Sequence, residues 1–268
     1  MTAPNDSLLR PPIARALVTG ASRRVGRATV LELARSGVEP VLTFRAREAE
    51  CRATAEDARG AARAAGFAVE PLVLRLDLAD PASVASFLSE IAPSVERRGL
   101  DAIVHNASDY TVSPLEACDG PALAALLERA HRAEAVAPTI ITTALRHALA
   151  KSAIAGGGAV VFFSDIYALG KPRRGYLAYS VAKAGVRALA EQLAVELAPA
   201  VRVHCIAPGV VAWAEGMDDA TKAAVLGRTP LARAGTPEDA ARLVRFLVLE
   251  ASYLTGGTIA IDGGRSLR

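Results

Sequence analysis

Short runs of apolar residues alternate with longer helical stretches along most of the chain. The short runs are typical of buried strands, and they cover residues 16–18, 41–44, 71–76, 102–104, 159–163, 201–206 and 258–261. The longer stretches, rich in Ala, Leu and Arg, predict helices over residues 24–36, 47–66, 81–97, 121–151, 178–198 and 237–249. Strands separated by helices imply right-handed crossovers. The pattern therefore predicts an α/β fold, a doubly wound domain whose parallel sheet of about seven strands has helices on both faces.

The same pattern predicts the domain organisation. No linker, repeat or low-complexity tract interrupts residues 13–268, which we expect to form a single domain. Residues 1–12 are polar, contain several prolines and lack an apolar core, which indicates a flexible leader and not a signal peptide. Residues 211–231 break the alternation directly after a strand. Because ligands of doubly wound proteins bind beyond the carboxyl ends of the strands, we expect this segment to cover the substrate.

Composition and charge narrow the class of function. The 268 residues are 51% hydrophobic and carry a net charge of +3, with both signs interspersed, so no basic stripe indicates nucleic acid. No apolar run approaches the ~20 residues of a membrane span. Cys51, Cys118 and Cys205 have no metal-ligand spacing and are typical of reduced thiols in a cytoplasmic protein. We expect a small-molecule substrate, with no metal, nucleic-acid or membrane partner.

A glycine-rich turn follows the first predicted strand. Residues 18–26 read Val-Thr-Gly-Ala-Ser-Arg-Arg-Val-Gly and lead into a helix, which is the geometry that cradles a dinucleotide pyrophosphate. Arg24 stands where such turns commonly have their middle glycine, and its guanidinium could donate to phosphate oxygens or to a ligand edge. The candidate cofactor-binding residues of this turn are Gly20, Ser22, Arg23, Arg24, Val25 and Gly26.

Tyr179 and Lys183 lie one turn apart in a predicted helix and therefore share a face. A nearby ammonium favours the phenolate, so we expect Lys183 to lower the pKa of Tyr179 and to make it a proton donor near neutral pH. Together with the glycine-rich turn, this pair indicates a nicotinamide-dependent oxidoreductase.

The two motifs resemble the short-chain dehydrogenase/reductase superfamily, and the resemblance runs from about Arg15 to the C-terminus. It includes Asp77-Leu78, His105-Asn106-Ala107-Ser108, Ala207-Pro208-Gly209 and the C-terminal motifs at 254–257 and 262–264. The resemblance implies a Rossmann-type domain and a homotetramer paired through helices 121–151 and 178–198, with a second contact near the last strand. It implies further cofactor-binding positions at Asp77, Leu78, Asn106, Ala107, Ser108, Tyr179, Lys183, Pro208 and Gly209.

The end of the second predicted strand indicates which cofactor is bound. Arg45 and Arg47 follow Phe44, and the nearest acids are Glu48 and Glu50. Sites for NAD generally have an acidic residue here that binds the ribose 2′-hydroxyl, whereas arginine suits a 2′-phosphate. We therefore expect NADPH, with Arg45 as one of its ligands.

Arg24 and the run Asn106-Ala107-Ser108-Asp109-Tyr110 resemble the pteridine reductases of bacteria within this superfamily. This resemblance implies that Tyr110 stacks on the pterin, and that Asp165 stands where most members have a serine that holds the substrate oxygen. A flat ring suits stacking, and a partly buried carboxyl has a raised pKa suited to exchanging a proton with a ring nitrogen. The catalytic candidates are Asp165, Tyr179 and Lys183; the substrate-binding candidates are Arg24, Ser108, Tyr110, Asp165, Tyr179 and Trp213.

Two features depart from the superfamily pattern. Glu134 stands where most members have an asparagine that organises a water-linked proton relay behind the lysine. The interval from Asp165 to Tyr179 is also longer than the family implies, which places an insertion at residues 168–172.

The leading hypothesis is an NADPH-dependent pteridine reductase that transfers a hydride to a ring C=N bond of dihydropterins, and also of pterins or folates. Tyr179 would supply the proton, directly or through Asp165 and water, while ordering of the two rings supplies much of the catalysis. One alternative is a short-chain carbonyl reductase acting on 3-oxoacyl thioesters, with Ser164 holding the carbonyl oxygen. Another is a non-catalytic NADPH-binding sensor or scaffold, which Glu134 favours.

Overall fold

The structure is a computed structural model that describes residues 9–214 and 216–268. Most of the predicted leader, residues 1–8, lies outside the described residues. Arg10, which the prediction placed in the leader, is held by the domain. Its amide donates to the carbonyl of Gly66 at 3.0 Å, and its guanidinium lies 4.2 Å from the ring centroid of Phe67.

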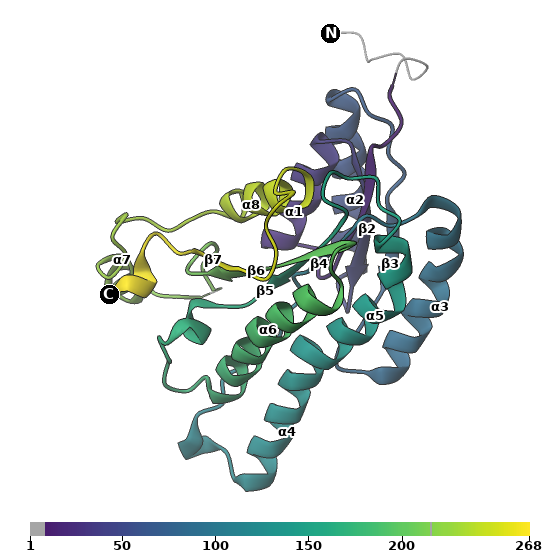
Figure 1. The fold of residues 1–268 in the computed structure, drawn as a ribbon. Helices are drawn as coiled ribbons and strands as arrows, with labels where there is room; N and C mark the ends of the chain where they lie inside the picture. The colour runs from purple at the N-terminus through teal and green to yellow at the C-terminus, as the bar shows by residue number, and fades with distance from the viewer. Residues whose placement is uncertain (1–8, 215) are drawn as a thin grey trace.

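A seven-stranded parallel sheet forms the centre of the single domain, with the strand order β3-β2-β1-β4-β5-β6-β7 (Figure 1). All seven predicted strands are present, so the predicted fold class is confirmed. The order reverses between β1 and β4, and this reversal is the point at which doubly wound proteins bind ligands. The strands are β1 (Ala14–Val18), β2 (Val38–Phe44), β3 (Leu72–Arg75), β4 (Ala102–His105), β5 (Gly158–Phe163), β6 (Val201–Pro208) and β7 (Thr258–Ile261).

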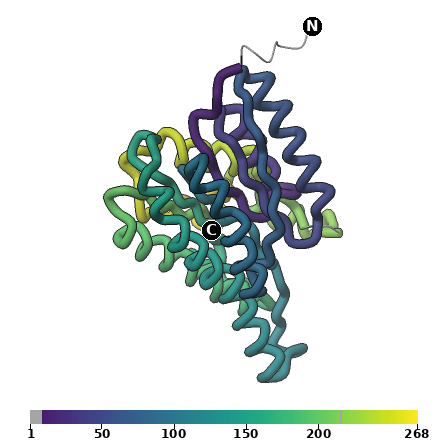
Figure 2. The backbone as a smooth tube through the Cα atoms, turned by 90° about the vertical axis from the view of Figure 1, so that its right-hand side faces the viewer, coloured from purple at the N-terminus to yellow at the C-terminus, as the bar shows by residue number. Residues whose placement is uncertain are grey.

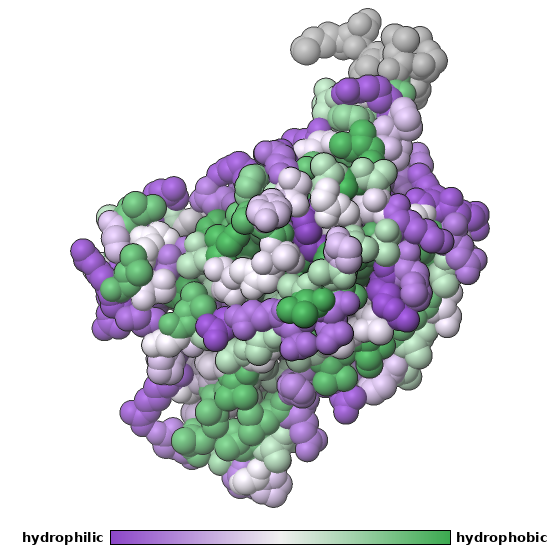
Figure 3. Space-filling model, in the orientation of Figure 1, coloured by the Kyte–Doolittle hydropathy of each residue, from purple (hydrophilic) through white to green (hydrophobic). Residues whose placement is uncertain are grey.

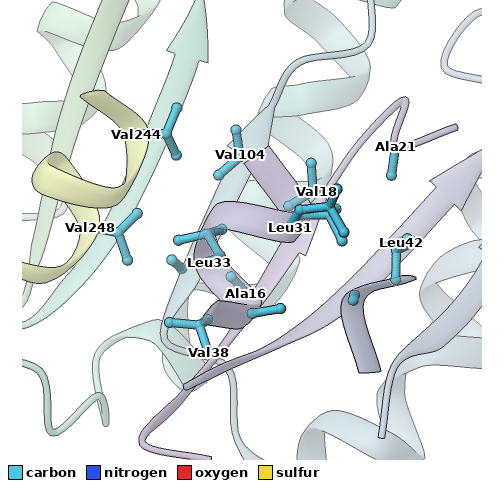
Figure 4. Close-up of a cluster of buried hydrophobic side chains, with 14 of the residues drawn as sticks. Ala16, Val18, Ala21, Leu31, Leu33, Val38, Leu42, Val104, Val244 and Val248 are labelled. Atoms are coloured by element: carbon cyan, nitrogen blue, oxygen red, sulfur yellow. The ribbon is translucent and has the colours of Figure 1, made fainter. Parts of the chain in front are cut away.

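Helices cover both faces of the sheet because successive residues of a strand point to opposite sides. Ala16 and Val18 of β1 pack with α1 and α8 on one face, as Figure 4 shows, whereas Leu17 belongs to the core under α3, α5 and α6. The helices are α1 (Arg24–Arg35), α2 (Glu48–Ala64), α3 (Pro81–Arg98), α4 (Gly120–His131), α5 (Ala137–Leu149), α6 (Leu177–Glu196), α7 (Asp219–Leu226) and α8 (Pro237–Leu249).

The helix predicted over residues 121–151 is present, but it is not a regular α-helix throughout. It consists of α4 and α5, joined by a π-helical turn at Arg132–Val136. Pro138 has no amide hydrogen to donate to the carbonyl four residues earlier, so the regular hydrogen-bond ladder cannot pass through this point. The wider turn buries Glu134, whose exposed fraction is 4%, and single π turns of this kind are frequent at functional sites.

Helix α4 is the least covered of the long helices. Ala130 is its one buried residue, and in both Figure 1 and Figure 2 the N-terminal end of α4 projects beyond the rest of the domain. Within the described part of the chain, no helix is both long enough and apolar enough to cross a membrane.

Candidate active site

The turn between β1 and α1 requires glycine at two positions. Gly20 has a φ of +67°, and a Cβ at Gly26 would lie 2.1 Å from the carbonyl oxygen of Gly20. Arg24 also has a positive φ, +50°, although a left-handed conformation costs a residue with a side chain on the order of 1 kcal/mol. Such strain is retained mainly at functional sites, so the conformation of Arg24 supports a ligand-binding role.

Thr19 and Asn106 tie this turn to the end of β4. The Thr19 hydroxyl accepts hydrogen bonds from the amides of Asn106 and Ala107, both at 3.0 Å. The Asn106 side-chain amide donates to the carbonyls of Thr19 at 2.9 Å and Gly20 at 3.2 Å. These bonds hold the glycine-rich turn at the reversal of strand order. Thr19 is absent from the sequence-based candidates, because a single threonine in an apolar strand carries no distinguishing pattern.

A cavity of about 450 Å³ opens above this turn at the carboxyl ends of the strands. The site suits a dinucleotide, because the glycine-rich turn leads into the N-terminus of α1 beside this cavity, and a Cβ at Gly26 would clash with Gly20 and Asn106, which hold the turn closed. Every residue predicted to bind the cofactor lines this cavity: Gly20, Ser22, Arg23, Arg24, Val25, Gly26, Arg45, Asp77, Leu78, Asn106, Ala107, Ser108, Tyr179, Lys183, Pro208 and Gly209.

A second cavity, of about 610 Å³, adjoins the first. Arg24, Tyr110, Asp165 and Tyr179 line both cavities and therefore mark their junction. Trp213 lines the second cavity alone, whereas Ser108 lines only the first. Residues from the predicted covering segment 211–231, including those of α7, form one wall of the second cavity. Two adjoining cavities suit a cofactor and a substrate that react where they meet.

Asp165 and Tyr179 are joined by a hydrogen bond at this junction. The Tyr179 hydroxyl donates to Asp165 Oδ2 at 2.8 Å, and Asp165 Oδ1 accepts from the Tyr167 amide at 2.9 Å, which fixes the carboxyl. Burial raises the pKa of Asp165 above its usual value. The carboxyl and the phenol can therefore pass a proton between them.

The expectation that Lys183 lowers the pKa of Tyr179 is wrong. Burial, the negative charge of Asp165 and its hydrogen bond, and the negative charge of Glu134 together raise the pKa of Tyr179 well above its usual value. Lys183 does not offset them, because its ammonium lies 5.7 Å from the centroid of the Tyr179 ring and is paired elsewhere. Tyr179 is consequently held in the protonated state, as a proton donor requires.

Glu134 is the partner of Lys183. Lys183 Nζ donates to Glu134 Oε2 and to the carbonyl oxygen of Phe163, both at 2.7 Å, and the exposed fractions of the two charged side chains are 2% and 4%. Glu134 Oε1 accepts from the Ser108 hydroxyl at 2.5 Å and from the Asp109 amide at 3.2 Å. Glu134 thus links the lysine of α6 to the loop after β4, at the position where the superfamily pattern has asparagine.

Tyr110 lies among other aromatic rings at the mouth of the junction. Its ring contacts Tyr179 edge-on and Tyr176 in a tilted arrangement, with centroid distances of 4.9 and 4.8 Å. Arg173 donates to the hydroxyls of Tyr110 at 2.9 Å and Tyr167 at 3.0 Å. Tyr110 keeps 45% of its surface exposed, which leaves area for a further planar ring. Arg173, Tyr167 and Tyr176 are absent from the sequence-based candidates, although the high Arg and Tyr content of residues 167–176 is a usable signal.

The predicted insertion at residues 168–172 turns toward the second cavity. Gly170 ends a short 3₁₀ turn in the left-handed conformation, and Lys171 and Pro172 then line the cavity wall. Ser164, in contrast, donates its hydroxyl to the main-chain carbonyl of Lys183 at 2.7 Å and is 3% exposed. Residues 170–172 therefore shape the second cavity, while Ser164 is engaged by α6, and the insertion itself stays a prediction.

Comparison with known proteins identifies the family of the chain. The sequence profile of the family described as enoyl-(acyl carrier protein) reductase matches residues 20–266. The chain belongs to this family and, with it, to the short-chain dehydrogenase/reductase superfamily of oxidoreductases. A Rossmann fold of this family implies a nicotinamide cofactor.

Several relatives match over nearly their whole length. Cis-4-hydroxycyclohexanecarboxylate dehydrogenase from Sinomonas cyclohexanicum is 32% identical, over 93% of this chain and 95% of its own. Dihydromonapterin reductase from Klebsiella pneumoniae subsp. pneumoniae is 27% identical, over 94% of this chain and 96% of its own. A crystal structure from Sinorhizobium meliloti 1021, assigned to the short-chain alcohol dehydrogenases, has a TM-score of 0.81 at 27% identity and covers 95% of this chain and 96% of its own.

Replacing Glu134 by Gln tests the electrostatics of the site. The substitution keeps the shape of the side chain but removes a negative charge that raises the pKa of Tyr179. We expect Tyr179 to ionise at lower pH in Glu134→Gln. The measurement is tyrosinate absorbance in the ultraviolet during a pH titration, with the Tyr179→Phe derivative of each protein subtracted to isolate this residue.

Glu128→Gln is the matched control, because Glu128 lies on the exposed side of α4 and its loss removes the same charge away from the site. It should leave the titration of Tyr179 unchanged. The electrostatic account is wrong if Tyr179 ionises at the same pH in Glu134→Gln as in the parent.

Proposed function

We propose that the protein is an NADPH-dependent pteridine reductase that reduces dihydropterins, and also pterins or folates, at a ring C=N bond. The observation that carries the proposal is the carboxyl of Asp165 hydrogen-bonded to Tyr179, beside the half-exposed ring of Tyr110, where the two cavities meet. A pterin offers a flat aromatic face and ring nitrogens that accept or donate protons. Tyr110 and Asp165 match these two features.

Each residue at the junction has a distinct task in this proposal. A bound NADPH supplies the hydride. Tyr110 and the strand ends hold the pterin ring flat, which aligns the reacting groups. Tyr179 delivers the proton to the ring nitrogen, directly or through Asp165 to which its hydroxyl donates, and the raised pKa of Tyr179 keeps that proton on the phenol until it is transferred. Lys183, fixed by Glu134, lines the cofactor cavity and positions the ribose.

A short-chain carbonyl reductase is the second candidate. Among the relatives, a granaticin polyketide synthase ketoacyl reductase from Streptomyces violaceoruber is 32% identical over 94% of this chain. That reaction would need Ser164 to bind the substrate oxygen, but the Ser164 hydroxyl donates to the carbonyl of Lys183. The carbonyl reaction also leaves Tyr110 and Asp165 without a role, and for these reasons the pterin proposal is preferred.

Turnover of dihydrobiopterin and of an acetoacetyl thioester by three variants separates the two candidates. Tyr110→Ala should raise the KM for dihydrobiopterin about fivefold, because it removes a stacking contact of about 1 kcal/mol. Asp165→Asn should mainly lower kcat, since proton delivery strengthens in the transition state. Tyr179→Phe should abolish turnover. The measurement is steady-state oxidation of NADPH.

Ile13→Ala, at an exposed residue ahead of β1 and away from both cavities, is the control and should behave as the parent. The pterin proposal fails if no pterin is turned over while the acetoacetyl thioester is reduced and Ser164→Ala is the most damaging change.

We propose NADPH as the cofactor because the end of β2 is basic. Arg45 lines the cofactor cavity, is 53% exposed and lies 3.5 Å from Asp109. The acids that follow are already paired, Glu50 with Arg47 at 2.7 Å and Glu48 with Arg52 at 2.7 Å. Arg45 therefore adds positive charge to the lining of the cofactor cavity at the end of β2, which suits a ribose 2′-phosphate.

Arg45→Asp should reduce the preference for NADPH over NADH by about tenfold or more, because one attraction becomes a repulsion. The ratio of kcat/KM for the two cofactors measures this preference. Arg52→Asp makes the same charge change outside the cavity and should have little effect. Equal kcat/KM values of the parent for NADPH and NADH would contradict the assignment.

We also propose a homotetramer, paired through the α4–α5 and α6 helices with a second contact near β7. Leu177 and Val181 on α6 are 40% and 54% exposed, and Figure 3 shows apolar side chains gathered over α6 and α4. Beside β7, Tyr253 and Leu254 are also exposed. Monomeric proteins rarely leave such contiguous apolar surface in water.

The molar mass from light scattering at micromolar concentration should be that of four chains. Val181→Asp should lower it by placing charge in the α6 contact, whereas Ile13→Asp, at an exposed apolar residue ahead of β1, should not. A monomeric parent would rule out this assembly.

We propose that the protein is cytoplasmic because its cysteines are free thiols. Cys51, Cys118 and Cys205 are all free, and Cys51 and Cys205 are buried. Free thiols are usual in reducing compartments. Cell fractionation tests this assignment, and recovery of the protein outside the cytoplasmic fraction would overturn it.

A further inference from the structure

The second cavity has an unusually cationic lining. Arg24 and Arg173 line it near the junction, and Lys171, Arg228, Arg265 and Arg268 line it further along. Among the residues that the structure describes, Asp165 supplies the single carboxylate side chain of the lining. The excess of positive charge is therefore a property of the substrate cavity, in a protein whose overall net charge is only +3.

The cations divide into two groups by their contacts. Arg173 is engaged by tyrosine hydroxyls, and Arg24 also lines the cofactor cavity, where phosphates would bind. Lys171, Arg228 and Arg265 have no carboxylate within 4 Å among the described residues, although most arginines of the surface form such pairs. Like charges that share a cavity repel one another, so cations with no carboxylate in contact favour an anionic ligand.

Three separate parts of the chain bring these cations together. Lys171 comes from the insertion before α6, Arg228 follows α7, and Arg265 follows β7. Hydrogen bonding places the last two near each other, since the Leu231 amide donates to the Gly263 carbonyl at 3.1 Å; Figure 1 shows α7 beside the C-terminal turn. Arg265 is also near enough to Asp165 to oppose, through its charge, the rise in the pKa of that carboxyl.

We infer that the substrate carries a carboxylate or phosphate group, which Lys171, Arg228 and Arg265 bind while the reacting ring lies between Tyr110 and Asp165. Arginine donates paired hydrogen bonds to either anion, and the cavity walls exclude part of the solvent that would screen them. The inference rests on the proposed reductase activity and specifies the substrate class that is used best, namely a reducible ring with an anionic tail.

Matched substrate pairs test this inference. Dihydrofolate is compared with its dimethyl ester, and dihydroneopterin 3′-monophosphate with dihydroneopterin, so that within each pair only the anionic group changes. We expect kcat/KM to favour at least one charged member by about tenfold or more, through a lower KM that rises with ionic strength. The preferred pair identifies the anion as carboxylate or phosphate.

Arg228→Gln and Arg265→Gln should each lower kcat/KM about tenfold for the charged member and less than about twofold for the neutral one. Arg174→Gln is the control, because Arg174 is 90% exposed, pairs with Glu116 and does not line the cavity. Equal use of the charged and neutral members, or equal losses for both in the Arg228 and Arg265 variants, would overturn the inference.

A third substrate pair tests the anionic subsite independently of whether the pterin proposal holds. If no pterin is reduced, acetoacetyl coenzyme A is compared with the neutral acetoacetyl-N-acetylcysteamine. A preference for the charged thioester that Arg228→Gln and Arg265→Gln remove would support the anionic subsite while the pterin proposal fails. Equal use of these two thioesters would overturn the subsite as well.

Discussion

The reversal of strand order between β1 and β4 is the constraint on which the rest of the site depends. Parallel strands that are buried on both faces must be joined by helical crossovers. The strands that follow β1 are added on one side of it, as β2 and β3, whereas β4 to β7 are added on the other side. The hydrogen bonds between Thr19 and Asn106 join the carboxyl ends of these two strands. They hold the glycine-rich turn on one side and the loop carrying Ser108 and Tyr110 on the other, so a feature of the whole sheet sets the geometry of the cofactor cavity.

The buried ion pair between Glu134 and Lys183 is a second constraint, and it affects the ionisation of the groups in the site. Loss of one partner from such a pair typically costs about 3–5 kcal/mol, because the remaining charge is left buried without compensation. Glu134 and Lys183 therefore depend on each other, and the π-helical turn at Arg132–Val136 gives Glu134 the inward position that the pair requires. This pairing also affects the protonation of Tyr179. With the lysine charge balanced, the phenol keeps its proton, which suits reduction more than the reverse reaction.

The fold class was predictable from the sequence. Strands buried on both faces are continuous apolar runs, and all seven strands were predicted on that basis. Strand β2 was predicted from residue 41 but begins at Val38, since Pro40 and the buried Glu39 resemble a strand boundary. Glu39 is accommodated by an ion pair with Arg15 at 3.1 Å. A local hydropathy pattern cannot predict an ion pair between residues this far apart in the sequence.

In the candidate site, too, features that depend on local motifs were predictable, whereas features formed by residues distant in the sequence were not. Glycine-rich and Asn-Ala-Ser motifs are local, so they identified the lining of the cofactor cavity. The direction of the Tyr179 pKa shift was not predictable, because it depends on Asp165 and Glu134, which only the fold brings to the phenol. The cationic lining was missed for the same reason, since Lys171, Arg228 and Arg265 are far apart in the sequence.

In the proposed reaction, a hydride passes from bound NADPH to a pterin ring where the two cavities meet. This transfer is tested most directly by incubating the protein with dihydrobiopterin and NADPH that carries deuterium at the transferable position of its nicotinamide, and analysing the product by nuclear magnetic resonance. The account predicts a tetrahydropterin with deuterium on the ring carbon of the reduced C=N bond. A dihydropterin that remains unreduced, or a reduced product without deuterium at that carbon, would contradict it.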